Sequence, residues 1–199
     1  MALKIQYNKT YMQQLRRELA VRENALPTLQ TKEAALRLEV KKARQAVAAV
    51  ERDLTARRAA AAPTHRLWRE FPPGLVRVKH VDVEIRKIAG VKTPQVRAVQ
   101  FEVAPHSLVA QPSWIEPGLA IVRELVELHV RKEIAEQKAQ ILERARRKTT
   151  QKVNLYEKVQ IPEYHEALLK IKRFLEDDEN LSKSSQKILK ARIAAAEAA

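Results

Sequence analysis

The stretch MQQLRRELAVRENALPTLQTKEAALRLEVKKARQAVAAVERDL, residues 12–54, repeats apolar side chains at spacings that alternate strictly between three and four. The repeated positions are Met12, Leu15, Leu19, Arg22, Leu26, Leu29, Glu33, Leu36, Val40, Ala43, Val47, Val50 and Leu54. Only Arg22 and Glu33 interrupt the apolar run. A mean spacing of 3.5 residues is typical of a helix that wraps around a partner helix in a left-handed supercoil. The stretch therefore predicts one long helix, of roughly 75 Å at about 1.5 Å per residue, that needs a second helix.

The composition favours long helices over a thick globular core. Aromatic residues make up 5% of the 199 residues, charged residues make up 31%, and only three glycines are present. Doubly wound and all-β folds need more frequent turns than this chain offers. The absence of cysteine excludes disulfides and thiolate metal sites. No run of eighteen apolar residues and no N-terminal signal core is found, so we expect a cytoplasmic protein that does not insert into a membrane.

The segment 63–116 contains six prolines and has no helical periodicity. Residues 81–85 and 99–103 alternate apolar and polar side chains, which predicts two half-buried strands. Gly90, in the loop between them, can reverse the chain by taking a positive φ. We therefore predict a β-hairpin at about residues 75–103. Val76 and Val78 are out of phase with Val81, which indicates a bulge or a break between them.

A second stripe with three-four spacing follows Pro117, a proline placed as in the first turn of a helix. The stripe slips by one residue at Ile161 and Pro162, which indicates a kink or a local rewinding. The predicted fold is mainly α, with a long antiparallel coiled coil of the N- and C-terminal helices and a small insert that contains the hairpin. The predicted domains are 1–62, 63–116 and 117–199, the last kinked near Pro162.

Catalytic and cofactor motifs are missing from the sequence. Three glycines cannot build a phosphate-binding loop, and neither GxxxxGK[ST] nor GxGxxG occurs. The five histidines are isolated, without the spacing of metal ligands. Ser184 to Lys187 match SxxK, but without the partner motifs that give this pattern meaning. We therefore expect no catalytic, cofactor-binding or metal site, and no enzyme activity of the chain by itself.

The net charge of +14 implies an acidic partner, although most of these charges can simply form a solvated helix face. Three interpretations remain on these grounds. The first is a rod surrounded by an acidic protein cavity, the second a basic coiled-coil arm that binds structured RNA, and the third a structural scaffold. Nucleic-acid binding depends on charge alone, because the aromatic residues follow no known nucleic-acid-binding pattern.

Three segments resemble the D subunit of the vacuolar and archaeal-type rotary ATPases. The first comprises Asn8-Lys9-Thr10, Leu15 to Ala20 and Lys32-Glu33. The second is the loop Ile88 to Pro94, similar to the family's Gly-Val-Lys-x-Pro turn, and the third is Thr150 to Asn154 with Ile161-Pro162. The matches lie in order and span nearly the whole chain. Pro27, the spacer Tyr156 to Lys158 and the short alanine tail depart from the family pattern.

The resemblance implies a central rotor shaft that couples ATP hydrolysis or synthesis to proton or sodium translocation. Its terminal helices would insert into a hexamer of catalytic A and nucleotide-binding B subunits. Its lower part would bind the F subunit and an adaptor of the C/d type on the membrane ring. The chain would be present in one copy, as a peripheral part of a membrane-bound complex, and catalysis would occur at the A/B interfaces.

Two sets of contact residues follow from exposed basic positions near the shared tip of the helices and from the hairpin turn. The expected contacts with the A/B head are Lys9, Arg16, Arg17, Lys183, Lys187 and Lys190. The expected contacts with the F subunit and the lower stalk are Gly90, Val91, Lys92, Thr93 and Pro94.

Overall fold

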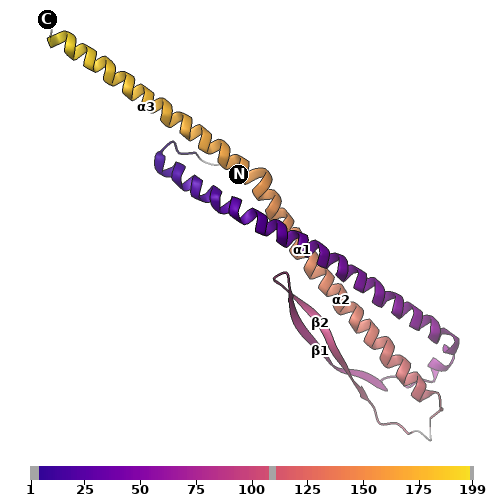
Figure 1. Ribbon diagram of the computed structural model, residues 1–199. Coiled ribbons are helices and arrows are strands. Elements are labelled where there is room, and N and C mark those ends of the chain that lie inside the picture. Colours follow the sequence, from indigo (N-terminus) through magenta and orange to yellow (C-terminus); the bar gives the residue numbers. More distant parts are fainter. Residues whose placement is uncertain (1–4, 108–110, 198–199) are drawn as a thin grey trace. The chain divides into compact units, whose positions relative to one another are not determined.

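The computed structural model describes residues 5–107 and 111–197. Residues 1–4, 108–110 and 198–199, which belong to the predicted segments 1–62, 63–116 and 117–199, lie outside the described residues. Figure 1 shows the elements in chain order. They are α1 (Lys9–Ala61), two short 3₁₀ turns (Ala62–Thr64 and Leu67–Arg69), β1 (Val76–Ile88), β2 (Val91–Val103), α2 (Ile115–Leu155), a π-helical turn (Tyr156–Gln160) and α3 (Ile161–Glu197). The predicted mainly α fold with a β-hairpin insert is confirmed.

The heptad stripe of α1 is the face that packs. Of its thirteen positions six are buried and seven half-buried, so none is exposed. Asn8 caps the helix, since its Oδ1 accepts a hydrogen bond of 2.6 Å from the backbone N–H of Tyr11. Pro27 lies inside α1 without ending it, although an interior proline costs about 3 kcal/mol and one backbone hydrogen bond. Leu26 and Leu29, on both sides of this proline, stay half-buried in the stripe.

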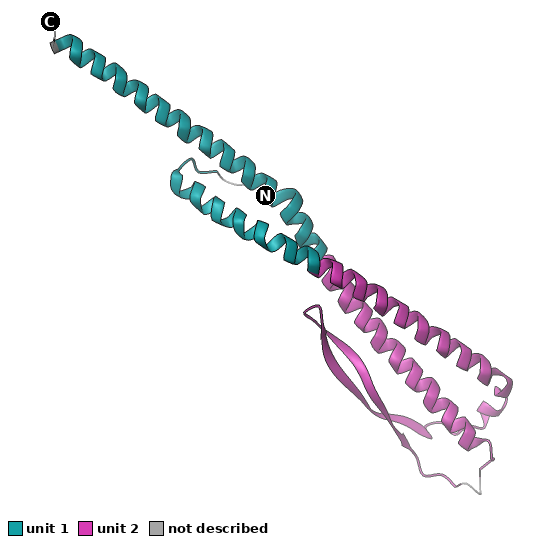
Figure 2. Ribbon diagram, viewed as in Figure 1, with its two compact units in different colours: residues 1–31, 149–199 teal, residues 32–148 magenta. Residues whose placement is uncertain are grey.

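The chain forms two compact units, the described parts of residues 1–31 with 149–199 and residues 32–148 (Figure 2). In the first unit, the start of α1 packs antiparallel against α3. Its core consists of Leu15, Leu19, Tyr164, Ala167 and Ile171. The antiparallel direction follows from the pairs, because Tyr7 meets Phe174 while Arg22 meets Gln160.

In the second unit, the rest of α1 pairs antiparallel with α2, and the β-hairpin packs on both helices. One core cluster consists of Leu36, Val40, Ala43 and Leu142, with Ile88, Ala89 and Val91 of the hairpin packed against it. Another joins Leu75, Ile115 and Leu119 near the base of the hairpin. Glu33 pairs with Arg146 and Glu51 with Lys132, which shows the opposite directions of the two helices.

β1 and β2 form a two-stranded antiparallel sheet with two irregularities in register. The first, between Val78 and His80, confirms the predicted bulge. The second, between Asp82 and Val83, was not expected. Val83 and Ile85, predicted to be half-buried, are 37% and 67% exposed, so this part of the prediction is wrong. All side chains from Val83 to Lys87 are exposed, so this part of β1 has no buried face.

The hairpin turn is a two-residue turn in which both central residues have positive φ, 48° at Ala89 and 78° at Gly90. This is the backbone of a type I′ turn, whose twist matches that of the strands. A side chain in this conformation costs about 1–2 kcal/mol.

Gly90→Ala is therefore expected to lower the free energy of unfolding by about that amount. Urea denaturation would measure the loss, with the exposed strand position Lys92→Ala as control; equal effects of both would contradict it.

The stripe's one-residue slip coincides with the π-helical turn Tyr156–Gln160, which directly precedes Ile161 and Pro162. A π turn accommodates one additional residue within a helix and is common at functional sites. Pro162 has no amide hydrogen for the helix ladder. The wider turn lets α3 present Tyr164 and Ala167 to α1 in the correct phase.

Candidate functional site: interaction surfaces

The last part of α3 is a helix without a packing partner among the described residues. Every described side chain from Glu176 to Ala196 is exposed, whereas Ile171 is fully buried against α1. α1 begins at Lys9, and Tyr7 just before it contacts Phe174, with ring centroids 4.9 Å apart and the rings tilted by 48°. Among the described residues, α3 therefore has a partner only up to about this position. This exposed part of α3 carries large apolar side chains: Leu181 (68% exposed), Ile188 (57%), Leu189 (59%) and Ile193 (50%).

The basic residues expected at this end are all exposed. Lys9, Arg16 and Arg17 lie on α1, and Lys183, Lys187 and Lys190 lie on α3, all within the first unit. Lys183 forms an ion pair of 2.6 Å with Glu179, and this pair and the nearby Lys9 lower the pKa of Glu179. The six residues thus belong to the same unit as the exposed apolar side chains at the end of α3, residues 181–193, called the tail below. The heptad spacing alone gave no sign that these apolar side chains form an exposed surface.

Arg22 interrupts the apolar stripe but is well accommodated between the helices. Its Nε donates a hydrogen bond of 2.9 Å to Oε1 of Gln160, and its guanidinium carbon lies 4.5 Å from the centroid of the Tyr164 ring. The Tyr164 hydroxyl donates a hydrogen bond of 2.6 Å to Glu18. Burial, and then this hydrogen bond, raise the pKa of Tyr164 to about 12, and the same bond lowers the pKa of Glu18. The polar residues therefore fix the pairing of α1 with α3.

The hairpin turn presents only part of the surface expected of it. Thr93 is 1% exposed, and its hydroxyl donates a hydrogen bond of 3.1 Å to the carbonyl of Arg86. Val91 is half-buried against the helix core, and Pro94 is half-buried too. Gly90 and Lys92 are exposed. Thr93 and Val91 thus hold the hairpin together and onto the helices, and solvent is left to Gly90 and Lys92.

Two other apolar surfaces belong to the second unit. On the hairpin, Val78, Val83 and Ile85 are exposed. Near the start of α2, the rings of Trp68 and Trp114 meet edge to face at 5.7 Å. Trp68 also lines a hollow of about 260 Å³, together with Arg58, Ala61, Ala62, Val122 and Leu125. Sequence reasoning noted Trp68 but had no signal for the hollow, which depends on how α1 and α2 are paired.

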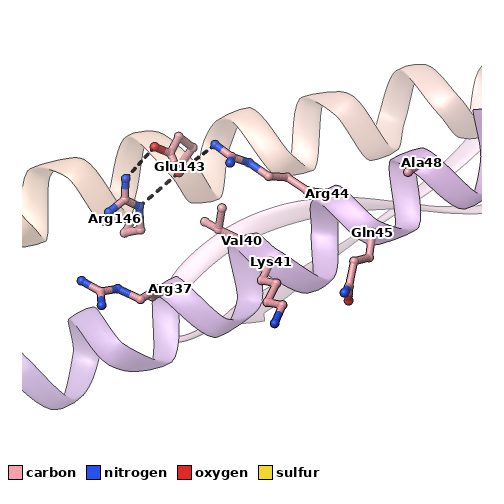
Figure 3. A pocket seen from close by; sticks show the side chains of 8 residues that line it. All are labelled: Arg37, Val40, Lys41, Arg44, Gln45, Ala48, Glu143 and Arg146. Atoms are coloured by element: carbon pink, nitrogen blue, oxygen red, sulfur yellow. Dashed lines mark hydrogen bonds and ion pairs between the residues drawn. The ribbon is translucent and has the colours of Figure 1, made fainter.

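A cluster of arginines surrounds Glu143 on α2 (Figure 3). Arg146 donates hydrogen bonds of 3.1 and 2.8 Å to its two oxygens, and Arg147 donates one of 3.1 Å. From α1, Arg44 approaches the same carboxylate at 3.6 Å. The hydrogen bonds from Arg146 are the main cause that lowers the pKa of Glu143 to about 2, although burial acts in the opposite direction.

Glu143→Gln should therefore make stability less dependent on pH. A carboxyl with a lowered folded-state pKa stabilises the fold above its unfolded pKa, near 4.5, and this contribution is lost as the pH falls toward 2. We expect the variant to lose about 1–2 kcal/mol at pH 7. The difference from the unchanged chain should shrink between pH 5 and pH 3. Urea denaturation at several pH values measures it, with the exposed Glu133→Gln as control. A difference that is constant over this range would contradict the expectation.

The described residues contain no group of three or more histidine, aspartate or glutamate side chains that could hold a metal ion. No described helix is long and apolar enough to cross a membrane. The described residues expose charged and apolar side chains on paired helices. Side chains of these kinds can form contacts with other macromolecules.

Comparisons with known proteins show what this chain is similar to. The model of the family of ATP synthase D subunits matches residues 11–191. The D subunit of a V-type ATP synthase from Chlamydia pneumoniae is 32% identical over 182 residues, which cover 89% of this chain and 87% of that protein. The protein of the same name from Borreliella burgdorferi is 29% identical over 190 residues, 94% of each chain. That from Chlamydia felis is 33% identical over 165 residues, 80% of this chain and 79% of the relative.

Proposed function

Because the chain belongs to the family of ATP synthase D subunits, we propose that it is the central rotor shaft of a V-type or archaeal-type rotary ATPase. In this role it has no catalytic site of its own. Segments 1–62 and 117–199 form the shaft and 63–116 the insert. ATP is hydrolysed or made at the interfaces of A and B subunits, and the shaft couples this chemistry to ion movement through a membrane ring. The chain is then a peripheral part of a membrane-bound complex.

The observation that carries this proposal is the exposed end of α3. A helix that continues for more than twenty residues beyond its last buried side chain, Ile171, has no packing reason within the described chain. Half-exposed apolar residues such as Leu181 and Ile188 are expected where a partner covers them. A ring of A and B subunits would supply that cover, and Lys9, Arg16, Arg17, Lys183, Lys187 and Lys190 would meet polar groups around it.

The coupling mechanism follows from the asymmetry of such a shaft. Three equivalent catalytic sites that face different sides of one helix pair experience different contacts, so each side stabilises a different conformation. The shaft must also turn without sticking. The charged residues on the outer faces of α1 and α3, such as Arg17 and Lys170, suit a surface that slides.

The second unit supplies the contacts with the other rotor subunits. The hairpin, with the exposed Gly90 and Lys92 at its turn and Val83 and Ile85 on its strand, is the surface for the F subunit. The hollow near Trp68 suits an apolar side chain of the C/d-type adaptor on the membrane ring. Val91, Thr93 and Pro94 support this surface from within.

Co-expression with A, B and F subunits tests the proposal. The expected result is one complex, isolated by size exclusion, with a single copy of this chain and with ATPase activity that depends on it. Failure to join an A/B hexamer, together with no binding to F, would contradict it. The alternative, an RNA-binding arm, predicts instead that the chain binds duplex RNA tightly and that this binding weakens strongly as the salt concentration is raised.

A further inference from the structure

An open groove of about 530 Å³ runs along α1 and α2 in the second unit (Figure 3). Its lining residues all belong to these two helices: Arg37, Val40, Lys41, Arg44, Gln45, Ala48, Glu143 and Arg146. The hairpin lies on another flank, where Pro94 shares a hollow with Ala46 and Lys138. Within residues 5–107 and 111–197, nothing but α1 and α2 lines this groove.

Positive charge in the groove exceeds negative charge. Six cations lie in or beside it, Arg37, Lys41, Arg44, Arg144, Arg146 and Arg147, against the carboxylates of Glu33 and Glu143. Like charges normally spread apart, but Glu143 draws Arg44, Arg146 and Arg147 toward one point. A guanidinium has five N–H donors, and the side chains of Arg44 and Arg147 are 67% and 70% exposed, so both keep donors open to solvent beside Glu143. Incoming carboxylates can therefore bind here without breaking the existing pairs.

The spacing of the cations indicates the shape of the partner. Arg37, Lys41 and Arg44 follow one another at intervals of four and three, so they share one side of α1. The groove extends over α1 from Arg37 to Ala48, about 16 Å at the rise of an α-helix. That length fits a segment of polypeptide better than a small anion. Val40 and Ala48 add an apolar floor, on which aliphatic side chains can rest.

We propose that this groove binds a helix of a partner protein that presents Asp or Glu side chains at positions i, i+4 and i+7, opposite Arg37, Lys41 and Arg44. The bound helix packs beside α1 and α2 as a third helix. Its acidic side chains select it, as charged residues at flanking positions select partners in coiled coils. A protein helix suits the groove better than nucleic acid, because none of the eight lining side chains is an aromatic ring on which a base could stack. The inference rests on the proposed function only in placing the chain within a complex.

Photo-cross-linking in the full-length chain tests this inference. A benzophenone amino acid replaces Gln45, which lines the groove, in cells that make the chain with its natural partners. Irradiation should join the chain to one protein, and mass spectrometry should place the cross-link in a helix with acidic residues spaced by three or four. Neutralising two cations with Lys41→Gln and Arg44→Gln should lower the yield at least fivefold.

The matched control neutralises two exposed cations of the other unit, Lys158→Gln and Arg173→Gln, and should leave the yield within twofold. Circular dichroism would establish that both double variants keep their helix content, and Arg37→Gln offers a milder change on the same side. A cross-link to RNA, one to a segment without acidic residues, or none at all would overturn the inference. So would equal losses in both double variants. Failure of the chain to assemble with A and B subunits would instead count against the proposed function, while an acidic-helix cross-link would still support this groove.

Discussion

A chain that ends after Asn180 is expected to bind the A/B head at least 30-fold more weakly than the full-length chain. The truncation removes Leu181, Ile188, Leu189 and Ile193, each half-exposed or more. Covering their free area in a complex is worth about 2–4 kcal/mol in total, which corresponds to about 30-fold to 1,000-fold in Kd. Coupling of ATP hydrolysis to rotation should weaken with it.

The same truncation should leave the fold of the remaining chain unchanged. Its last buried residue is Ile171, so no core contact is lost. The melting temperature and the affinity for the F subunit should therefore stay close to those of the full-length chain. Surface plasmon resonance against isolated A/B hexamers and against F measures both affinities. Loss of F binding with normal binding to the hexamer would mean that the partners of the two units have been assigned in reverse.

A full-length control separates apolar contacts from charge. Ile188→Ser with Leu189→Ser keeps all three lysines of the tail, whereas neutralising Lys183, Lys187 and Lys190 to glutamine keeps the apolar side chains. We expect the first variant to account for most of the loss in affinity, because exposed ion pairs contribute only about 0–1 kcal/mol each. The lysine variant should mainly slow association.

Leu142→Ala is expected to destabilise the second unit by about 3 kcal/mol. Leu142 is 0% exposed and packs with Leu36, Val40 and Ala43 of α1. Removal of a fully buried leucine side chain costs the transfer free energy and leaves a cavity, typically about 2–5 kcal/mol in all. The hairpin turn rests on the same cluster, so its attachment should loosen too.

Hydrogen exchange can locate this loss. Amide protection should fall in residues 32–148, above all in the hairpin, and much less in the paired helices of the other unit, whose core around Ile171 shares no residue with the cluster. Leu38 of α1 is 55% exposed, so Leu38→Ala serves as control and should cost less than about 0.5 kcal/mol. Equal destabilisation by both variants would contradict the assigned core.

The sequence allowed the helical part of the fold to be predicted because burial on a coiled coil depends on local spacing alone. Leu15, Leu36 and Leu54 follow that spacing and are buried. Gly90 could be placed in the turn because few other residues adopt a positive φ. The bulge near Val78 could be predicted because Val76 and Val78 are out of phase with Val81 in the alternation of the strand.

Other features depend on contacts between distant residues and had no local signal. Val83 and Ile85 lie in a stretch of β1, residues 83–87, that is exposed on both faces, although the alternation of their side chains predicted burial. The arginine groove arises only when α1 and α2 are aligned so that Arg44 reaches Glu143. In the sequence, these charges look like any solvated helix face. The tail of α3 is exposed because α3 extends beyond the residues that pair with it. The periodicity of the sequence does not show where that pairing ends.

Single-molecule rotation tests the central claim most directly. The chain has no cysteine, so Gln137→Cys, at an exposed position of α2 in the second unit and outside the proposed partner surfaces, offers one attachment point on this chain for a bead. With the A/B head fixed to a surface, addition of ATP should turn the bead in one direction, with pauses that reflect the repeated catalytic sites. Continued ATP hydrolysis by the same complexes with only random motion of the bead would contradict the assignment of this chain as the rotor shaft.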